Sequence, residues 1–269
     1  MNRVYIVLCI FSFSFIQINW QECIYDDYHT YIKQATKDIN NKRYDKAKEH
    51  FNLAFEAVEV PLSKDIINAL NLYLKANDEE MILKLSIILA KGGIPKNYFQ
   101  QFQRLNWYPN FMQNFTQYDS IYKADFNIEY RRRISELIAY DINFNKKYHD
   151  WRSGNIDMSL NEMISEAKYI AVEFETLINE FGLPLEKKIG YYYDERLKRV
   201  SVLPIEVLII HNQQRGKFLI QSDQIELLIC NGLLDKSYQD LLPRIKGFSD
   251  EESIEAEMTL RYSKFGKKQ

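Results

Sequence analysis

An amphipathic run from Leu160 to Phe181 places the strongest constraint on what this chain can fold into. Its apolar residues recur every three or four positions, so an α-helix would bring them onto one face. Ser159 and Glu162 have the spacing of a capping box at its start, and Gly182 stops it. The run therefore predicts a long helix with one face in a core. The apolar residues are Leu160, Met163, Ile164, Ala167, Ile170, Ala171, Phe174, Leu177, Ile178 and Phe181.

The composition extends this prediction to the whole chain. Of the 269 residues only 9 are Gly and 6 are Pro, whereas 19 are Tyr and 16 are Phe. A β-sandwich or barrel needs short strands separated by many turn residues, so this composition favours helices. We expect an all-α fold, and the length allows one large domain or two small ones. The net charge of −2 lacks the basic footprint that nucleic acid requires, so we expect no nucleic-acid partner.

The first twenty residues form a segment of their own. Arg3 is followed by an almost unbroken apolar stretch, residues 4–18. Its length suits the apolar part of a signal peptide and is short for a membrane span of about 20 residues. We expect residues 1–20 to direct export to the periplasm or cell envelope, with cleavage between Ile18 and Cys23. An uncleaved membrane anchor formed by residues 4–20 is the alternative, and we expect no other membrane span.

Cleavage would remove Cys9 and leave two cysteines, Cys23 and Cys230. An even pair in an exported protein permits a disulfide. Two cysteines over this length are no disulfide framework, and Cys230 lies in an apolar stretch. We therefore expect free or buried thiols, with a Cys23–Cys230 bridge as the alternative.

Small and apolar residues recur at an offset of 34 positions through residues 28–95, a pattern that we call the 34-residue echo. This is the period of tetratricopeptide repeats, which the segment resembles. The resemblance implies that residues 24–105 form two helical hairpins, with residues 41–43 as the turn inside the first. Two ordinary hairpins of coincidentally similar length are the alternative. The pairs at this offset are Ala35 and Ala69, Ala47 and Met81, Phe51 and Leu85, Ala54 and Ile88, and Pro61 and Pro95.

The same resemblance assigns roles to two tyrosines. Tyr31 and Tyr44 fall at packing positions of the first unit, where they would fill the space between helices or line a groove. Aromatic side chains are favoured anchors at protein interfaces. The resemblance therefore implies a protein partner for this part of the chain. In the second unit, Asn77 with Glu80 has the spacing of a cap for the second helix.

Residues 110–262 predict a second helical domain, followed by a frayed basic tail over residues 263–269. Two polar residues, His211 and Asn212, end its most apolar helix, where an unpaired polar group would cost on the order of 1–3 kcal/mol. We expect a backbone carbonyl or a neighbouring side chain to satisfy each of them, with a ligand-binding or catalytic role as the alternative. The expected helices cover residues 111–123, 126–152 and 160–181, with others starting at Pro204, Asp223 and Ser249.

The order of motifs over residues 126–265 resembles a family of bacterial, often exported, helical domains of unknown function. Asp141 stands at the first position of that family's Asp-Gln-x-x-Arg motif, and His211 keeps the His of its Gln-His motif. Arg261 and Tyr262 keep part of its terminal motif. The resemblance implies a helical domain in which these four side chains converge.

Strong signatures of catalysis and of metal binding are absent from the sequence. It contains no His-Glu-x-x-His, no Cys-x-x-Cys, no Walker loop and no Gly-x-Ser-x-Gly elbow. We therefore expect no metal and no cofactor. Our first hypothesis is an exported, non-catalytic protein-interaction or structural module. The alternative is an enzyme of the hydrolase or transferase type that uses His211 with Asp141 and Arg261.

Overall fold

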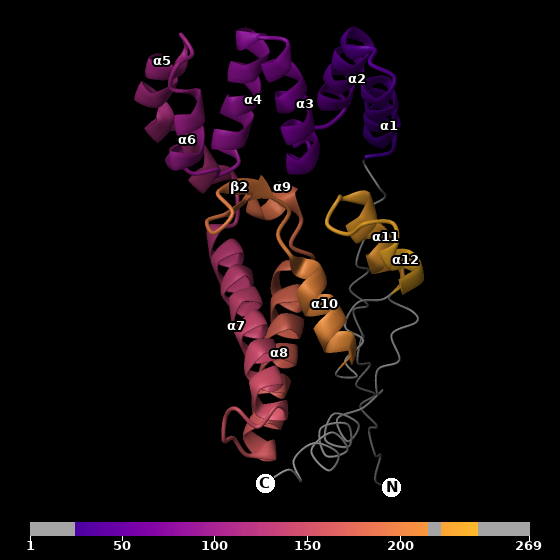
Figure 1. The fold of residues 1–269 in the computed structure, drawn as a ribbon, viewed down its shortest axis with the longest axis vertical. Coiled ribbons are helices and arrows are strands. Elements are labelled where there is room, and N and C mark those ends of the chain that lie inside the picture. The colour runs from indigo at the N-terminus through magenta and orange to yellow at the C-terminus, as the bar shows by residue number, and fades with distance from the viewer. Residues whose placement is uncertain (1–24, 215–221, 242–269) are drawn as a thin grey trace, which may run out of the picture.

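A computed structural model describes residues 25–214 and 222–241 of the chain. The fold is all-α, as predicted, and the described residues add one small antiparallel hairpin to the helices (Figure 1). Several predictions fall outside these residues: the leader at 1–20, the helix starting at Ser249, the tail at 263–269, and the positions of Arg261 and Tyr262.

Seven helical segments from the first half of the chain form the upper part of the molecule in Figure 1. The helix pairs α1–α2 and α3–α4 stand side by side there, and α6 packs against α4. The bounds are α1 (Asp26–Asn40), α2 (Tyr44–Glu56), α3 (Ser63–Lys75), α4 (Glu79–Lys91), the 3₁₀-helix η1 (Lys96–Phe102), α5 (Tyr108–Gln113) and α6 (Phe115–Asp125).

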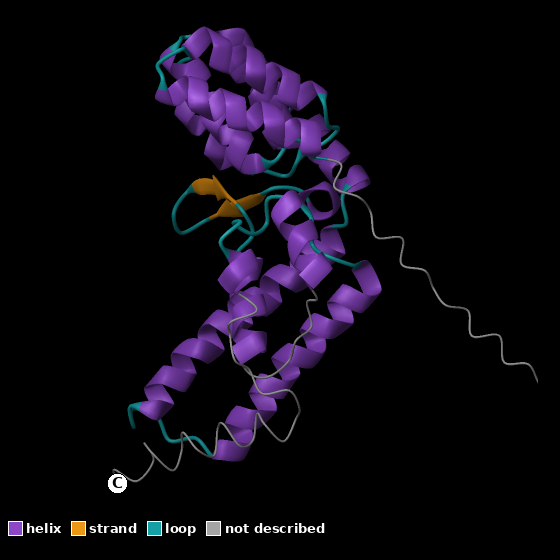
Figure 2. Ribbon diagram, turned by 90° about the vertical axis from the view of Figure 1, so that its right-hand side faces the viewer, coloured by secondary structure: helices purple, strands orange, loops and turns teal. Residues whose placement is uncertain are grey.

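Two long helices, α7 and α8, form the lower part of the molecule, and α10 packs against both. The hairpin β1–β2 and the short α9 lie between the two parts (Figures 1 and 2). These strands were not predicted from the sequence. The bounds are α7 (Ile128–Arg152), α8 (Leu160–Phe181), α9 (Glu186–Ile189), β1 (Tyr192–Asp194), β2 (Arg199–Ser201), α10 (Ile205–Gln214), α11 (Ser222–Cys230) and α12 (Tyr238–Leu241).

The predicted start, end and core face of α8 are confirmed. The Ser159 side chain and the Glu162 side chain form a reciprocal capping box, and Gly182 follows the helix with a φ of 73°. The buried face of α8 packs on α7 through Ile134, Leu137 and other apolar residues. The lower core is therefore the one that the helical spacing predicted.

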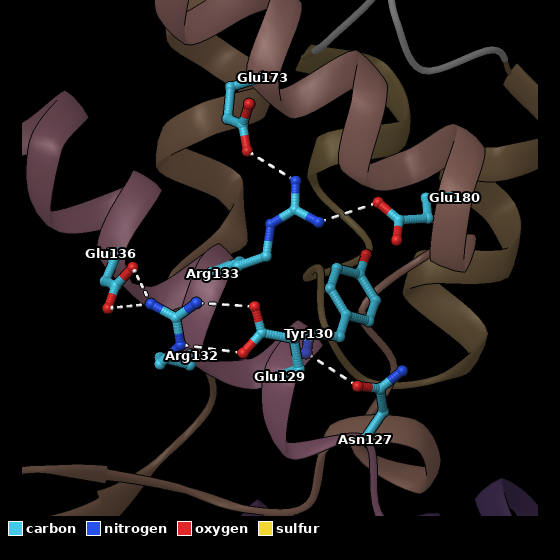
Figure 3. A network of polar contacts seen from close by, with 8 residues as sticks. All are labelled: Asn127, Glu129, Tyr130, Arg132, Arg133, Glu136, Glu173 and Glu180. Atoms are coloured by element: carbon cyan, nitrogen blue, oxygen red, sulfur yellow. Dashed lines mark hydrogen bonds and ion pairs between the residues drawn. The ribbon is translucent and has the colours of Figure 1, made fainter.

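Ion pairs on the surface add to the apolar contact between α7 and α8 (Figure 3). Arg133 of α7 donates to Glu173 and Glu180 of α8, each over 2.9 Å. Neighbouring Arg132 instead pairs within α7, with Glu129 and Glu136. Of these two arginines, only Arg133 connects the two helices, and Lys147 of α7 forms a further ion pair with Glu166 of α8 over 2.5 Å.

Two of the five residue pairs at the 34-residue offset are buried at both positions, whereas Met81, Ile88 and Pro95 are half-buried counterparts of buried residues. Ala35 and Ala69 are both fully buried, as are Phe51 and its counterpart Leu85 to within 1%. The cap of α4 differs from the prediction: Asp78 accepts from the Met81 backbone N–H over 3.2 Å. Asn77 cannot serve as this cap because it forms the preceding turn, with a φ of 52°.

The border between the two halves also differs from the prediction. A second domain was expected from residue 110, but Phe111 is buried in the same apolar cluster as α3 and α4. Helices α5 and α6 therefore belong to the upper core, and the lower part begins with α7. Asp223 was expected to be the N-cap of the next helix, but it lies inside α11, which begins at Ser222.

The preference for free or buried thiols is wrong for Cys230, which is disulfide-bonded. Its partner lies outside the described residues. Cys230 packs against the apolar cluster that contains Tyr25 and Tyr28 at the start of α1. The His29 ring nitrogen Nε2 lies 2.5 Å from the Cys230 carbonyl oxygen. These contacts join segments 201 residues apart, a separation over which sequence spacing gives no information on proximity.

The upper and lower parts meet where Tyr191 lies against Gly92. The backbone N–H of Tyr191 donates to the Gly92 carbonyl over 2.7 Å, and its hydroxyl donates to the Pro61 carbonyl over 2.8 Å. A Cβ atom at position 92 would lie 2.1 Å from the Tyr191 ring. Gly190, with a φ of 76°, brings the chain this close. Only glycine at position 92 leaves room for the ring.

We predict that Gly92→Ala destabilises the protein by about 1–3 kcal/mol, because the added methyl group overlaps a ring held at both ends. Urea denaturation followed by circular dichroism measures the change. The control is a double-mutant cycle with Tyr191→Ala, in which Gly92→Ala should have little further effect once the ring is gone. An equal loss of stability in both backgrounds would show that the ring is not the cause.

Candidate functional sites

The structure brings together two of the residues singled out in the sequence, His211 of α10 and Asp141 of α7. The His211 Nδ1 atom lies 2.5 Å from the Asp141 Oδ2 atom. Asp141 is fully buried, whereas 18% of the His211 side chain is exposed. Part of the polar end of α10 is satisfied in the way that we expected: the Asn212 amide nitrogen donates to the Leu208 carbonyl over 2.8 Å. The Asn212 amide oxygen is buried and has no hydrogen-bond partner among the described residues.

This pair has a geometry that acid–base chemistry can use. A carboxylate at Nδ1 holds the proton of the neutral ring there, which leaves the lone pair of Nε2 available. No bond to Nε2 of His211 is formed by the described residues. The same arrangement orients the base in hydrolases of the Ser-His-Asp type. Arg261 and Tyr262, the other residues predicted to converge here, lie outside the described residues.

The two tyrosines expected to serve packing or binding occupy different environments. Tyr31 is half-buried and packs against the cluster around Tyr28. Tyr44, at the first position of α2, is 48% exposed and belongs to none of the buried clusters of the described residues. The exposure of Tyr44 does not fit the expected packing role, and the alternative, that it lines a groove, stays a prediction.

A buried acidic cluster, which the sequence analysis missed, lies at the joint between the upper and lower parts. Glu186 of α9 accepts from the backbone N–H of Ser63 over 2.8 Å and from its hydroxyl over 2.5 Å. It thereby caps α3, whose own N-cap residue Leu62 makes no side-chain bond. The cap comes from a residue 123 positions away in the chain, so no local capping pattern could reveal it.

A second buried carboxylate, Asp65, lies near Glu186 and accepts from the Tyr28 hydroxyl over 2.8 Å. Burial, together with the negative charge of Asp65, raises the pKa of Glu186 to about 7, against the hydrogen bonds from Ser63. Burial also raises the pKa of Asp65. Both carboxyl groups therefore favour the neutral form more than a solvated carboxyl group does.

An open groove of about 730 Å³ lies across the same joint. Its lining includes Lys64 and Asn68 of α3, Tyr98 of η1, Glu206 of α10 and Tyr238 of α12. Four segments distant in sequence contribute to it, residues 64–68, 98–101, 198–206 and 232–238, and no motif marked it in advance. Aromatic rings among charged groups suit a ligand that carries both apolar and polar surface.

The strand β2 runs along this groove. Five consecutive residues, 198–202, line it. Side chains of a strand alternate between its two faces, so a groove that touches all three residues of β2 and the residue on either side follows the edge of the strand. The opposite edge of β2 pairs with β1 in the register Tyr193↔Val200. The groove therefore runs along a strand edge that has no partner strand within the described part of the chain.

Within residues 25–214 and 222–241, no helix is long and apolar enough to cross a membrane. The same residues hold no group of three or more His, Cys, Asp or Glu side chains placed to bind a metal ion.

Comparison with known proteins gives no family. No protein-family model matches the chain, and no curated protein or solved structure is significantly similar to it. The geometry of the groove and of the His211–Asp141 pair therefore carries the functional argument.

We predict that Glu186 makes the protein less stable as the pH rises from about 5 to 8. Its pKa is raised on folding, from 4.5 to about 7, so its contribution is complete below pH 4.5 and is lost as the pH passes about 7. Glu186→Gln cannot ionise and keeps an acceptor for Ser63. The stability of the wild type should fall across this range by roughly 3 kcal/mol more than that of the variant.

Urea denaturation at several pH values measures this difference. The exposed Glu195→Gln is the matched control, and its pH dependence should follow the wild type. Parallel curves for the wild type and Glu186→Gln would contradict the predicted ionisation.

Proposed function

We propose that this chain is an exported protein-interaction module that binds an extended segment of a partner protein in the groove between α3, β2 and α12. The observation that carries the proposal is the groove itself, which combines a strand edge, two aromatic rings and charges of both signs. Interfaces combine aromatic anchors with a polar rim in the same way.

Two further observations support export and a repeat-like upper part. The apolar stretch at residues 4–18 has the length of a signal-peptide core, and the disulfide at Cys230 suits an oxidising compartment. The helix pairs α1–α2 and α3–α4 share buried positions at the 34-residue offset of tetratricopeptide repeats. Stacked repeats of that kind present concave binding surfaces.

We predict that the double variant Lys198→Glu and Tyr238→Ala loses at least tenfold in affinity for a saturable partner from the envelope fraction, since it removes a charge and an anchor of the groove. Titration of the immobilised full-length chain with that fraction measures the loss. Lys146→Glu makes the same charge change on the exposed side of α7 and should bind as the wild type does. Equal binding by all three proteins, or a chain found only in the cytosol, would refute the proposal.

A second candidate function, acid–base catalysis by His211, is favoured by the buried carboxylate at Nδ1 and the partly exposed ring. A general base of this kind contributes typically 10²–10⁴-fold to a rate. The substrate would be one that a hydrolase or a transferase activates by removing a proton from water or from a hydroxyl group.

We predict that, if the chain hydrolyses any of a panel of chromogenic esters and phosphoesters, His211→Ala lowers the rate at least 100-fold. Asp141→Asn should lower it too, because the ring loses the partner that fixes its tautomer. Steady-state kinetics measures both effects, with circular dichroism as the check on folding. His149→Ala, at an exposed position of α7, should keep full activity. An inactive wild type, or an active His211→Ala, would exclude this function.

A further inference from the structure

We propose that the partner segment joins the hairpin as a third strand, pairing its backbone with the free edge of β2, and that it carries an acidic and a basic side chain at opposite ends. This inference rests on the proposed function, since it specifies how the same groove recognises a polypeptide. Strand addition of this kind takes its affinity from main-chain hydrogen bonds and its specificity from neighbouring side chains.

The unpaired edge of β2 lies along the groove. Residues 198–202 all line the groove, and in the described part of the chain β2 pairs with β1 alone. An unpaired strand edge presents a row of backbone N–H and C=O groups that can bind another strand. The groove thus offers a backbone template along its length.

The strand β2 is held in place by packing against the upper core. Val200, the middle residue of β2, is buried in the upper core together with Tyr193 of β1. The Tyr193 ring also meets the Tyr98 ring edge to face, with 6.0 Å between centroids. A strand fixed in this way loses little conformational freedom when a partner binds, which favours binding.

Charged side chains lie at both ends of the groove. Lys198 and Arg199 lie at the turn end of β2 and form no ion pair with a described residue. Asp194 is opposite Arg199 in register, but its carboxylate accepts from the Leu197 backbone N–H over 2.9 Å. The turn end of the groove is therefore open to a carboxylate of the partner.

The opposite end of the groove holds two carboxylates, Glu206 and Asp235, and the Lys64 ammonium group, whose charge acts on Asp235. Glu206 is half-buried there and forms no ion pair with the described residues. A half-buried carboxylate without a cation is unfavourable, and a lysine or arginine of the partner would relieve this. Asp235 also lines the groove, but the Ser237 backbone N–H and hydroxyl already donate to it over 2.9 and 2.7 Å. The charges thus select the direction of the bound strand.

The test begins with a displayed library of random twelve-residue peptides selected on the full-length chain. The comparison protein is the variant Lys198→Glu with Glu206→Lys, which reverses both ends and keeps the net charge. Peptides enriched on the wild type should bind the reversed variant at least tenfold more weakly. Synthetic versions of the best peptide are then N-methylated at one backbone position at a time.

Strand addition predicts an alternating result, because only every second backbone N–H of the peptide faces β2. Methylation at those positions should weaken binding about tenfold, the loss expected for one hydrogen bond, and methylation at the intervening positions should leave it within about threefold. Charge-dependent binding without alternation would overturn strand addition and leave the groove as a peptide site. Failure to enrich any peptide, or equal binding to both proteins, would overturn the groove itself. Self-association that the reversed variant loses would assign the groove to a second copy of the chain.

Discussion

The contact between Tyr191 and Gly92 is the constraint on which the arrangement of the molecule depends. The ring lies where a side chain at position 92 would be, and its hydroxyl donates to the carbonyl of Pro61. This fixes the segment 190–194 against the upper helices, and that segment leads directly into the hairpin. The strand β2, and with it the groove, therefore has a defined position because one glycine admits one ring.

Glu186 reinforces the same joint with polar contacts. A carboxylate from α9 caps α3 of the upper part, and Asp65 and Tyr28 continue the buried polar cluster. A buried polar network in which every group is hydrogen-bonded allows only one arrangement of the two surfaces. Apolar contact alone is less specific. The apolar ring and the acidic cap thus act on the same boundary, and the groove opens beside both.

Features that depend on local sequence patterns could be predicted from the sequence. Periodicity and the Ser159–Glu162 capping box located α8, and two of the five residue pairs at the 34-residue offset are buried at both positions. The run of three tyrosines over residues 191–193, a residue type enriched in strands, was a signal for a strand that we did not use. The groove, the Glu186 cap and the environment of Cys230 could not be found in this way, because each joins residues separated by more than a hundred positions. The Asp141–His211 contact was expected only through a family resemblance.

The packing of Cys230 against the start of α1 has a consequence for how the chain is made. The bond between His29 and the Cys230 carbonyl spans 201 residues, so α1 is covered by a segment that is synthesised much later than α1 itself. Contacts of such high sequence separation form slowly, because the intervening chain must be ordered before they are gained. Until then the Tyr25–Tyr28 surface remains open, as apolar surfaces on incomplete chains do, and is exposed to association with other molecules.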